Sequence, residues 1–517
     1  MDIHMPLSMH PFAFLAVSAL AYLIGDAIYQ LQFSPLSKFP GPKIAAVTYL
    51  YEFYYDAILK GRYIFKVKEL HKKYGPIIRI SPREIHIDDP HFYSILYSHS
   101  NPRDKEYYYL RPFDFPLSSF GTESHHLHRL RRGAMNPFFA RSKVLQQESL
   151  IQGLVEKLCS RIEQFSATRS IVPLSLGYTC LTTDLITTFT MDRCYGYLDA
   201  PDWYPNWGQV LRDASEMSMV SRQLTWILSV LKMLPKTFTM SLNPGLKLFY
   251  TLAERCKERI DEVRYERMEE HKGPGETVGR KKTLFDQIYD SRLSIEEKMP
   301  ARLTQEVRSI IGAGTETTSN CLSVISYHLL LNPERLQRLK EELQELEPDP
   351  TAEIKLCQLE KLPYLLISQS SVVLEGLRLS YGVSTRLQRK SREIMEYNGY
   401  VIPPGTPVGM SSVIVHHNED IFPDSHSFIP ERWLDLQKRK YLEKYMVSFS
   451  SGSRRCLGMN LARAEIFIAT STIFRRFDFE LCHTTRDDIQ IHHDLFIPRP
   501  KNLKTVGVQA RVKSKPG

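Results

Sequence analysis

The sequence has no closely spaced cysteine pair, no long run of like charge and no internal repeat. Its eight cysteines stand far apart, so neither a CxxC zinc or redox site nor a disulfide framework is indicated, and a reducing compartment fits. The 67 basic and 58 acidic residues are dispersed, and a net charge of +9 is modest for 517 residues. These absences argue against a disulfide-stapled secreted protein, a zinc module and a partner made of nucleic acid.

An apolar segment from Phe12 to Leu31 has about the twenty residues that span a bilayer, although Asp26 weakens it. No Lys or Arg precedes the segment, whereas Lys38 and Lys43 follow it, so the positive-inside rule places the bulk of the chain on the cytoplasmic side. A cleaved signal peptide is the alternative, but a basic n-region and a small-residue cleavage site are missing. We expect a membrane anchor in residues 1–35.

The rest of the chain is predicted to be mainly α-helical with small β-sheets. Pro300 opens a segment without a helix breaker before Asn332-Pro333, which predicts a helix about 45 Å long at 1.5 Å per residue. Further helices are predicted at 150–165 and 246–270, and short strands at 77–80, 84–87, 384–387 and 400–402. A stiff turn is expected at Phe39-Pro-Gly-Pro42 and a charged surface loop at 271–282.

One loop carries the strongest chemical signal, Phe449-Ser-Ser-Gly452-Ser-Arg454-Arg-Cys456-Leu-Gly458. The two glycines let the backbone turn tightly and approach a flat ligand. Cys456 precedes a helix predicted from Met459 to Arg475, whose N-terminal amides and dipole favour a thiolate, the form that binds metals. Arg454 can reach an anionic group on the same ligand. A buried structural cysteine in a glycine-rich turn is the alternative.

Two further motifs lie on predicted helices. Ala313-Gly-Thr-Glu-Thr-Thr318 occurs within the long helix although glycine and threonine both weaken helices. A purely structural alternative is that the hydroxyls donate to main-chain carbonyls of their own helix. Glu375 and Arg378 are three residues apart, so they share a helix face and can pair.

The pattern FxxGxRxCxG resembles the haem-binding loop of the cytochrome P-450 family, the haem-thiolate monooxygenases. The resemblance covers about 36–512 and implies a single prism-shaped catalytic domain over residues 36–517. It implies haem b with Cys456 as the axial ligand, whose thiolate favours O–O cleavage. Phe449, Gly452, Arg454 and Gly458 are then the cofactor-binding positions of the loop.

The resemblance also assigns roles to the helical motifs. Thr317 would hydrogen-bond dioxygen and Glu316 would relay protons to it, while Gly314 would leave room by letting the helix open locally. Glu375, Arg378 and Arg432 would form a buried ionic triad that supports the cysteine loop, Arg432 belonging to Phe428-Ile-Pro-Glu-Arg-Trp433.

Haem carries two propionates, and the resemblance assigns them to His128, Arg132, Arg389 and Arg454. His128 stands where the family has tryptophan, and both side chains donate a ring N–H. A metal site at His125–His128 is the alternative, but no carboxylate or cysteine joins it at ligand spacing. An acidic flavin domain could dock on basic residues expected to be exposed nearby, namely Arg129, Arg131, Arg141 and Lys143.

The substrate pocket would be lined by largely aromatic and apolar segments, which suit an apolar polycyclic or prenylated substrate bound by shape complementarity. By resemblance these are 107–120, 217–234, 310–313, 382–385 and 494–497, with the aromatics Tyr107, Tyr108, Tyr109, Phe113, Phe115, Phe120, Trp226 and Phe496. Aromatic clusters are also common in ordinary cores.

The motif details look most like filamentous-fungal enzymes of secondary metabolism, including the trichodiene-oxygenase-like group. This implies hydroxylation or epoxidation of an apolar intermediate, for which a terpenoid is preferred over a polyketide or an alkaloid. Electrons would come from NADPH through a separate NADPH–cytochrome P-450 reductase, with cytochrome b5 as a further donor, because no glycine-rich nucleotide fingerprint is evident. A single-pass protein of the endoplasmic reticulum is implied. A haem-thiolate isomerase or dehydratase that needs no external electrons, and a non-catalytic haem carrier, stay open as alternatives.

Overall fold

The computed structural model describes residues 11–203, 205–242, 246–270, 281–359 and 371–513. Most of the predicted surface loop at 271–282 lies outside the described residues. Mainly helical architecture with small sheets is confirmed, and all eight cysteines are free thiols.

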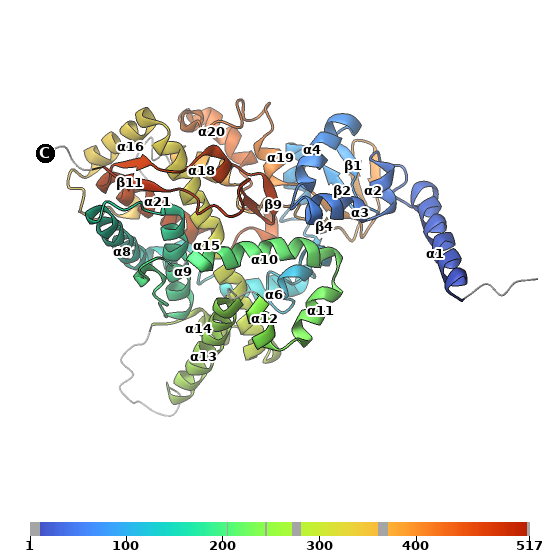
Figure 1. The fold of residues 1–517 in the computed structure, drawn as a ribbon, viewed down its shortest axis with the longest axis horizontal. Coiled ribbons are helices and arrows are strands. Elements are labelled where there is room, and N and C mark those ends of the chain that lie inside the picture. Colours follow the sequence, from blue (N-terminus) through green and yellow to red (C-terminus); the bar gives the residue numbers. More distant parts are fainter. Residues whose placement is uncertain (1–10, 204, 243–245, 271–280, 360–370, 514–517) are drawn as a thin grey trace, which may run out of the picture.

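Helix α1 (Pro11–Ile28) projects from the body in Figure 1 and continues as a π-helical turn, Tyr29–Phe33. By length and composition, 12–33 could cross a membrane. The base of this helix is tied to strand β1 (Ile77–Arg79), because Arg79 donates to the carbonyl of Gln30 at 2.7 Å. The amide of Arg79 also donates to Pro40, 2.7 Å away. At Gly41 (φ +152°) a Cβ would lie 2.3 Å from the carbonyl oxygen of Arg79, so this close turn requires glycine.

The largest sheet has five strands in the order β1-β2-β7-β4-β3, in which only β2 and β7 are parallel. Its other strands are β2 (Ile85–Ile87), β7 (Pro407–Gly409), β4 (Arg389–Lys390) and β3 (Asp104–Lys105). Three two-stranded sheets pair β5 (Met395–Tyr397) with β6 (Tyr400–Ile402), β8 (Phe479–Leu481) with β11 (Ala510–Val512), and β9 (His493–Leu495) with β10 (Ile497–Arg499).

The strand predicted at 384–387 is wrong, whereas those near 77–80, 84–87 and 400–402 are confirmed. Residues 384–387 form no ladder because loops take their main-chain hydrogen bonds. The amide of Ser384 donates to Phe496 and that of Leu387 to Met410. The regular strand begins only at Arg389.

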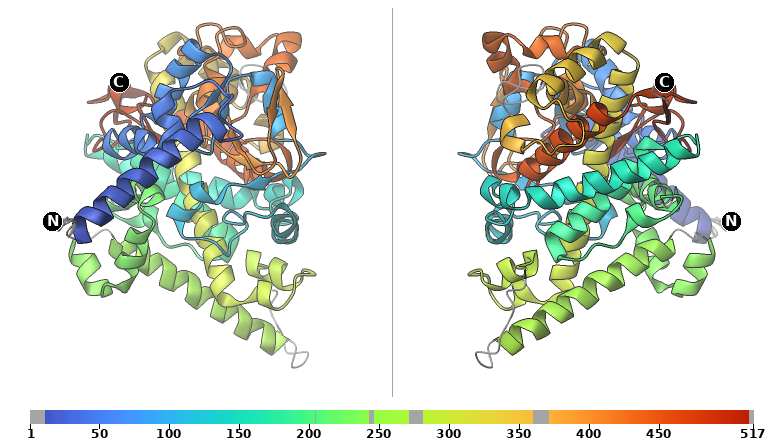
Figure 2. Two further views of the ribbon diagram at one scale, coloured as in Figure 1. Left: turned by 90° about the vertical axis from the view of Figure 1, so that its right-hand side faces the viewer. Right: turned by 90° about the vertical axis from the view of Figure 1, so that its left-hand side faces the viewer.

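Helix α15 (Pro300–Leu330) passes through the middle of the body in Figure 2 and confirms the predicted long helix. It packs against α9 (Leu174–Met191), α13 (Leu246–Glu270), α18 (Ser371–Ser380) and α21 (Met459–Arg476). Other helices that position the site are α6 (His125–Met135), α8 (Glu148–Ala167), α10 (Pro205–Gln223), α11 (Trp226–Met233) and α19 (Ser412–His416). The predicted helices at 150–165 and 246–270 are therefore α8 and α13.

Candidate functional site

The cysteine loop leads directly into α21, with Gly458 immediately before the helix. The Cys456 amide donates to the Phe449 carbonyl at 2.9 Å, which closes the loop. Gly452 has φ +69°, and a Cβ there would lie 2.2 Å from the Tyr97 carbonyl oxygen, so no larger residue fits. At Gly458 a Cβ would meet nothing within 4 Å, which leaves that side of the loop open to a flat ligand.

The thiol of Cys456 is accessible although protein surrounds it. Burial raises the pKa of this thiol, while the Gly458 amide and Arg132 lower it. The net shift is upward, so the helix terminus alone does not make the thiolate the favoured form, contrary to the expectation from sequence. A coordinated metal would supply the missing stabilisation, because a metal-bound thiol loses its proton.

Five basic side chains converge beside this loop from separate parts of the chain: Lys105, His128, Arg132, Arg389 and Arg454. The hydrogen bonds of the charged members go to uncharged oxygens, for example from Lys105 to the Phe120 carbonyl at 2.7 Å and from Arg454 to the Thr122 carbonyl at 2.8 Å. Among the residues that the structure describes, no carboxylate forms an ion pair with any of the five.

Burial shifts the pKa of every member of this cluster downwards, and repulsion by neighbouring cations adds to the shift for Lys105, His128 and Arg454. The pKa of Arg454 falls to about 9, first through burial and then through repulsion by Arg389. Burial also lowers the pKa of Lys105 well below its ordinary value, and Arg454 and Arg389 add to the effect. The pKa of His128 falls to about 2, and its buried Nδ1 has no hydrogen-bond partner in the described structure.

Buried cations without counter-ions are costly, and an anionic ligand removes that cost. A group with two carboxylates and a flat metal-binding ring fits both the cluster and the accessible thiol, and haem is such a group. The structure therefore brings together the predicted residues His128, Arg132, Arg389, Arg454 and Cys456.

Lys105 is a residue of the cluster that sequence reasoning missed. It belongs to the two-residue strand β3 and pairs in register with Arg389 of β4. No motif surrounds it in the sequence, so only this strand pairing could have revealed it.

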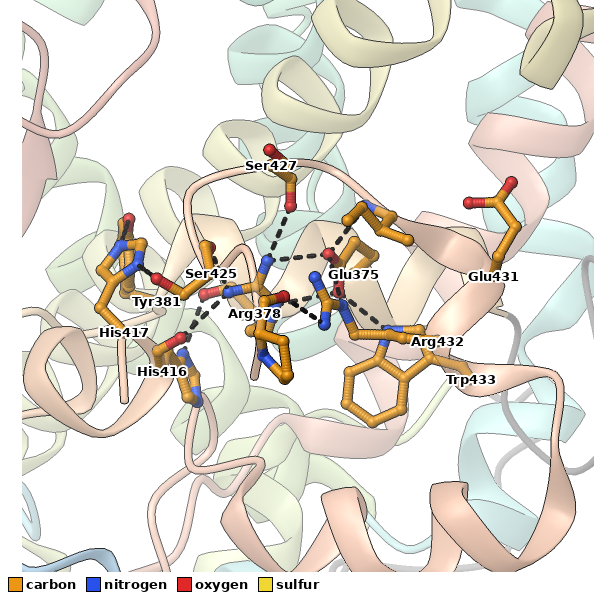
Figure 3. Close-up of polar contacts among 12 residues, drawn as sticks. Glu375, Arg378, Tyr381, His416, His417, Ser425, Ser427, Glu431, Arg432 and Trp433 are labelled. Atoms are coloured by element: carbon orange, nitrogen blue, oxygen red, sulfur yellow. Dashed lines mark hydrogen bonds and ion pairs between the residues drawn. The ribbon is translucent and has the colours of Figure 1, made fainter. Parts of the chain in front are cut away.

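The predicted ionic triad is assembled around the buried carboxylate of Glu375 (Figure 3). Arg378 donates to it through Nε at 2.9 Å and Nη2 at 2.7 Å, and Arg432 through Nε at 3.1 Å. The indole of Trp433 adds a hydrogen bond of 2.9 Å, and the Ile429 amide another of 2.9 Å. The sequence before this motif is largely apolar from 362 to 374, and residues 362–370 of this run lie outside the described residues.

Glu316 and Thr317 project from different faces of α15, because consecutive helical residues are about 100° apart. Thr317 donates to the Ala313 carbonyl at 2.8 Å, the back-bonded arrangement considered from sequence. Glu316 pairs with Arg499 of β10 in a cavity of about 110 Å³ that Arg212 also lines. The described contacts therefore do not join the two residues of the expected relay.

Gly314 does not open α15 locally, since the helix is continuous through this motif. A Cβ at Gly314 would lie 2.8 Å from Cγ1 of Ile186 in α9. The expectation from sequence is wrong here because the glycine serves the close packing of two helices. At Gly312 a Cβ would meet nothing within 4 Å.

Three of the predicted pocket aromatics meet although they come from distant segments. The ring centroids of Phe113 and Phe496 are 4.6 Å apart, and Phe120 lies 5.6 Å from Phe113 and 5.9 Å from Phe496. Phe496 has φ +74°, a strained conformation for an aromatic residue. The buried carboxylate of Asp494 holds it by accepting from the Phe496 amide at 3.2 Å and from Ser384 at 2.8 Å.

Arg131 and Trp226 differ in solvent exposure from what the sequence predicts. Arg131 is buried, because it forms a bidentate ion pair with Glu297 at 2.7 and 2.8 Å, so it cannot belong to an exposed docking face. Arg129 and Arg141 are exposed as expected. Trp226 is 61% exposed on α11, which is too open for the wall of a closed pocket.

Comparison with known proteins gives a consistent result. The family model for cytochrome P-450 matches residues 42–506. The chain is 43% identical to cytochrome P-450 monooxygenase MO6277 of Ascocoryne sarcoides, over 96% of this chain and 98% of that protein. It is 39% identical to tryptophan 6-hydroxylase fscE of Fusarium equiseti (95% and 94% covered) and 38% identical to N-acetyltryptophan 6-hydroxylase ivoC of Emericella nidulans (96% of each).

Proposed function

The chain belongs to the cytochrome P-450 family of monooxygenases, and on this basis we propose that it oxidises an apolar secondary-metabolite intermediate and that Cys456 would supply the thiolate ligand of its haem iron. The family uses cysteine-ligated haem iron and electrons delivered from NAD(P)H through a reductase. The single observation that carries the assignment of the site is the cluster of basic residues without carboxylate partners beside an accessible thiol. We assign residues 36–517 to the catalytic domain.

When bound, haem would supply the activation of dioxygen, in which one oxygen atom goes to the substrate and the other leaves as water with two electrons from the reductase and two protons. Around it, five basic side chains would hold the propionates, whose negative charge would offset the buried positive charge: Lys105, His128, Arg132, Arg389 and Arg454. Phe449, Gly452 and Gly458 shape the loop that presents the Cys456 sulfur, and Glu375, Arg378 and Arg432 keep the surrounding core rigid.

Thr317 and Glu316 handle protons in this proposal. The hydroxyl of Thr317 can turn from the Ala313 carbonyl to hold a proton on the accessible face of α15, which includes Ala313. Glu316 takes protons from solvent within the cavity that it shares with Arg499, and water must complete the path because the two side chains lie on different faces. Such a positioned acid–alcohol pair performs general acid catalysis.

Two substrate classes are supported by different observations. A terpenoid is the expectation from sequence resemblance, whereas an indole-bearing amino acid is suggested by the named activities of the two tryptophan hydroxylases. The cluster of Phe113, Phe120 and Phe496 offers aromatic faces to either a flat ring or an apolar polycycle. The two classes share an apolar ring system as the part that is oxidised, although the amino acid also carries charged groups.

We further propose that α1 anchors the protein in the endoplasmic reticulum with the catalytic domain in the cytoplasm. There it would meet NADPH–cytochrome P-450 reductase and cytochrome b5. Lys38 and Lys43 directly after the apolar segment support this orientation. Protease treatment of intact microsomes should digest the catalytic domain, and full protection would contradict the orientation.

Mass spectrometry of extracts from the organism expressing Cys456→Ala beside its wild-type strain tests the function. A monooxygenase predicts the loss of a product and the accumulation of a precursor with one or more oxygen atoms fewer. Labelled dioxygen should place its isotope in the wild-type product. If precursor and product have equal oxygen content, the rearranging isomerase or dehydratase is the better assignment, and an unchanged metabolite profile favours a non-catalytic haem protein.

A further inference from the structure

The ionic triad does not itself touch the cysteine loop that it is expected to support. Among the described residues, the side chains of Glu375, Arg378 and Arg432 bond to one another, to Trp433 and to main-chain groups between 416 and 429. None of these hydrogen bonds reaches the segment 446–458. Support of the loop therefore requires an intermediary.

His416, the last residue of α19, makes the missing connection. Arg378 donates through Nη1 to the His416 carbonyl at 3.0 Å, and the imidazole Nδ1 of His416 lies 2.9 Å from the Arg378 carbonyl, so two hydrogen bonds lock the pair (Figure 3). On its other side, the His416 Nε2 lies 3.0 Å from the amide of Val447. Arg378 and His416 are both fully buried, so water does not compete for these bonds.

The partners of His416 fix its tautomer. A carbonyl can only accept, so Nδ1 must carry the proton, and Nε2 is then free to accept from the Val447 amide. The imidazolium form would place a second donor against this N–H and break the contact. Burial lowers the pKa of His416 to about 3, with Arg378 adding to the shift, which keeps the ring neutral.

Val447 stands at the entrance to the cysteine loop. Two residues later, the Phe449 carbonyl accepts the hydrogen bond from the Cys456 amide that closes the loop. Between them, Ser448 donates to the Leu377 carbonyl of α18 at 2.8 Å. The start of the loop is thus fixed to α18 directly at Ser448 and through His416 at Val447.

We propose that His416 is the positioning residue through which the buried triad sets the geometry of the cysteine loop. The inference rests on the proposed function, because it assumes that Cys456 ligates the haem iron. None of the described hydrogen bonds of His416 reaches Cys456. His416 acts by connecting the fixed side chain of Arg378 to the backbone amide of Val447, at the start of the loop that carries Cys456.

Three substitutions in the full-length protein separate the two hydrogen bonds of the imidazole. His416→Ala removes both. His416→Asn keeps a donor near the position of Nδ1 but cannot reach Val447, whereas His416→Gln places a carbonyl oxygen near the position of Nε2 and can still accept from Val447. The matched control is His417→Gln, because His417 is also buried and bonds to Tyr381 and Ser425, and among the described residues none of its hydrogen bonds reaches the loop.

The measurements are hydrogen exchange of the Val447 amide and the fraction of haem that shows the ferrous–carbon monoxide band of thiolate ligation. We expect exchange to become roughly tenfold faster in His416→Ala and His416→Asn, which leave this N–H unpaired, and the thiolate fraction to fall in both. His416→Gln should stay within about threefold of wild type, and His417→Gln should match it.

Unchanged exchange and thiolate fraction in His416→Asn would overturn the proposal, as would an equal loss in His417→Gln. If His416→Ala does not fold, the comparison of Asn with Gln still decides the question. A wild-type protein that shows no thiolate band contradicts the proposed function instead, so the two failures are distinguishable.

Discussion

Replacing Glu375 by alanine should remove most of the stability of the haem-binding core. The carboxylate accepts five hydrogen bonds, two from Arg378 and one each from Arg432, Trp433 and Ile429. Removing one partner of a buried ion pair costs about 3–5 kcal/mol, and each buried neutral donor left unpaired adds about 1–3 kcal/mol. We therefore expect a loss of at least about 5 kcal/mol against a total stability of roughly 5–15 kcal/mol.

Denaturant unfolding followed by circular dichroism measures this loss, and haem content is measured on the same samples. Glu375→Gln, which retains an accepting oxygen, should lose less and gives a value if the alanine variant does not fold. The matched control is Glu431→Ala, because Glu431 pairs at 3.2 Å with Arg335 where both side chains are partly exposed, and such pairs are worth under about 1 kcal/mol. A Glu375→Ala protein with full haem and the stability of this control would refute the reasoning.

The contribution of Glu375 should also depend on pH. Burial raises the pKa of its carboxyl, but Arg378 and Arg432 together with the Ile429 amide lower it by more, so the net shift is downward from 4.5. A carboxyl with a depressed pKa stabilises the fold above its unfolded pKa and loses that effect as the pH falls through the folded value. The stability difference between wild type and Glu375→Gln should therefore be constant above about pH 4.5 and shrink below it. A difference that grows on acidification would contradict this assignment.

The remaining predictions concern the haem pocket and α15. Thr317→Ala should uncouple the enzyme, seen as more peroxide per NADPH consumed, and unchanged coupling would count against the proton role. Lys105→Met should weaken haem retention at least roughly tenfold, measured as transfer to a haem-scavenging apoprotein, because a charged hydrogen bond is worth about 1.5–3 kcal/mol. An unchanged transfer rate would show that Lys105 does not belong to the site. Gly314→Ala should destabilise the fold, since crowding against Ile186 costs about 1–3 kcal/mol and the gain in helix propensity is about 1 kcal/mol, whereas Gly312→Ala, with open space, should be neutral or stabilising.

Local sequence determined the features whose physics is contained in a few consecutive residues. The long helix α15 follows from about thirty residues without a breaker between two prolines, and helix formation needs only neighbours along the chain. The cysteine loop and the pairing of Glu375 with Arg378 were equally predictable, because glycine spacing and an i, i+3 interval fix geometry without distant partners. The family resemblance rests on these same contiguous motifs.

Tertiary structure alone decided which side chains meet across long intervals. Lys105 joins the cluster of basic side chains beside the cysteine loop through a strand pairing. Arg131 is buried because it pairs with Glu297, and Gly314 allows α9 to pack closely and does not open its own helix. His416 connects the motif of Glu375 and Arg378 to the cysteine loop, although it belongs to neither motif. Each outcome depends on burial and on a partner far away in the chain. The energy of a charge or hydrogen bond depends on that partner and on the exclusion of water, and neither can be predicted from the neighbouring residues in the sequence.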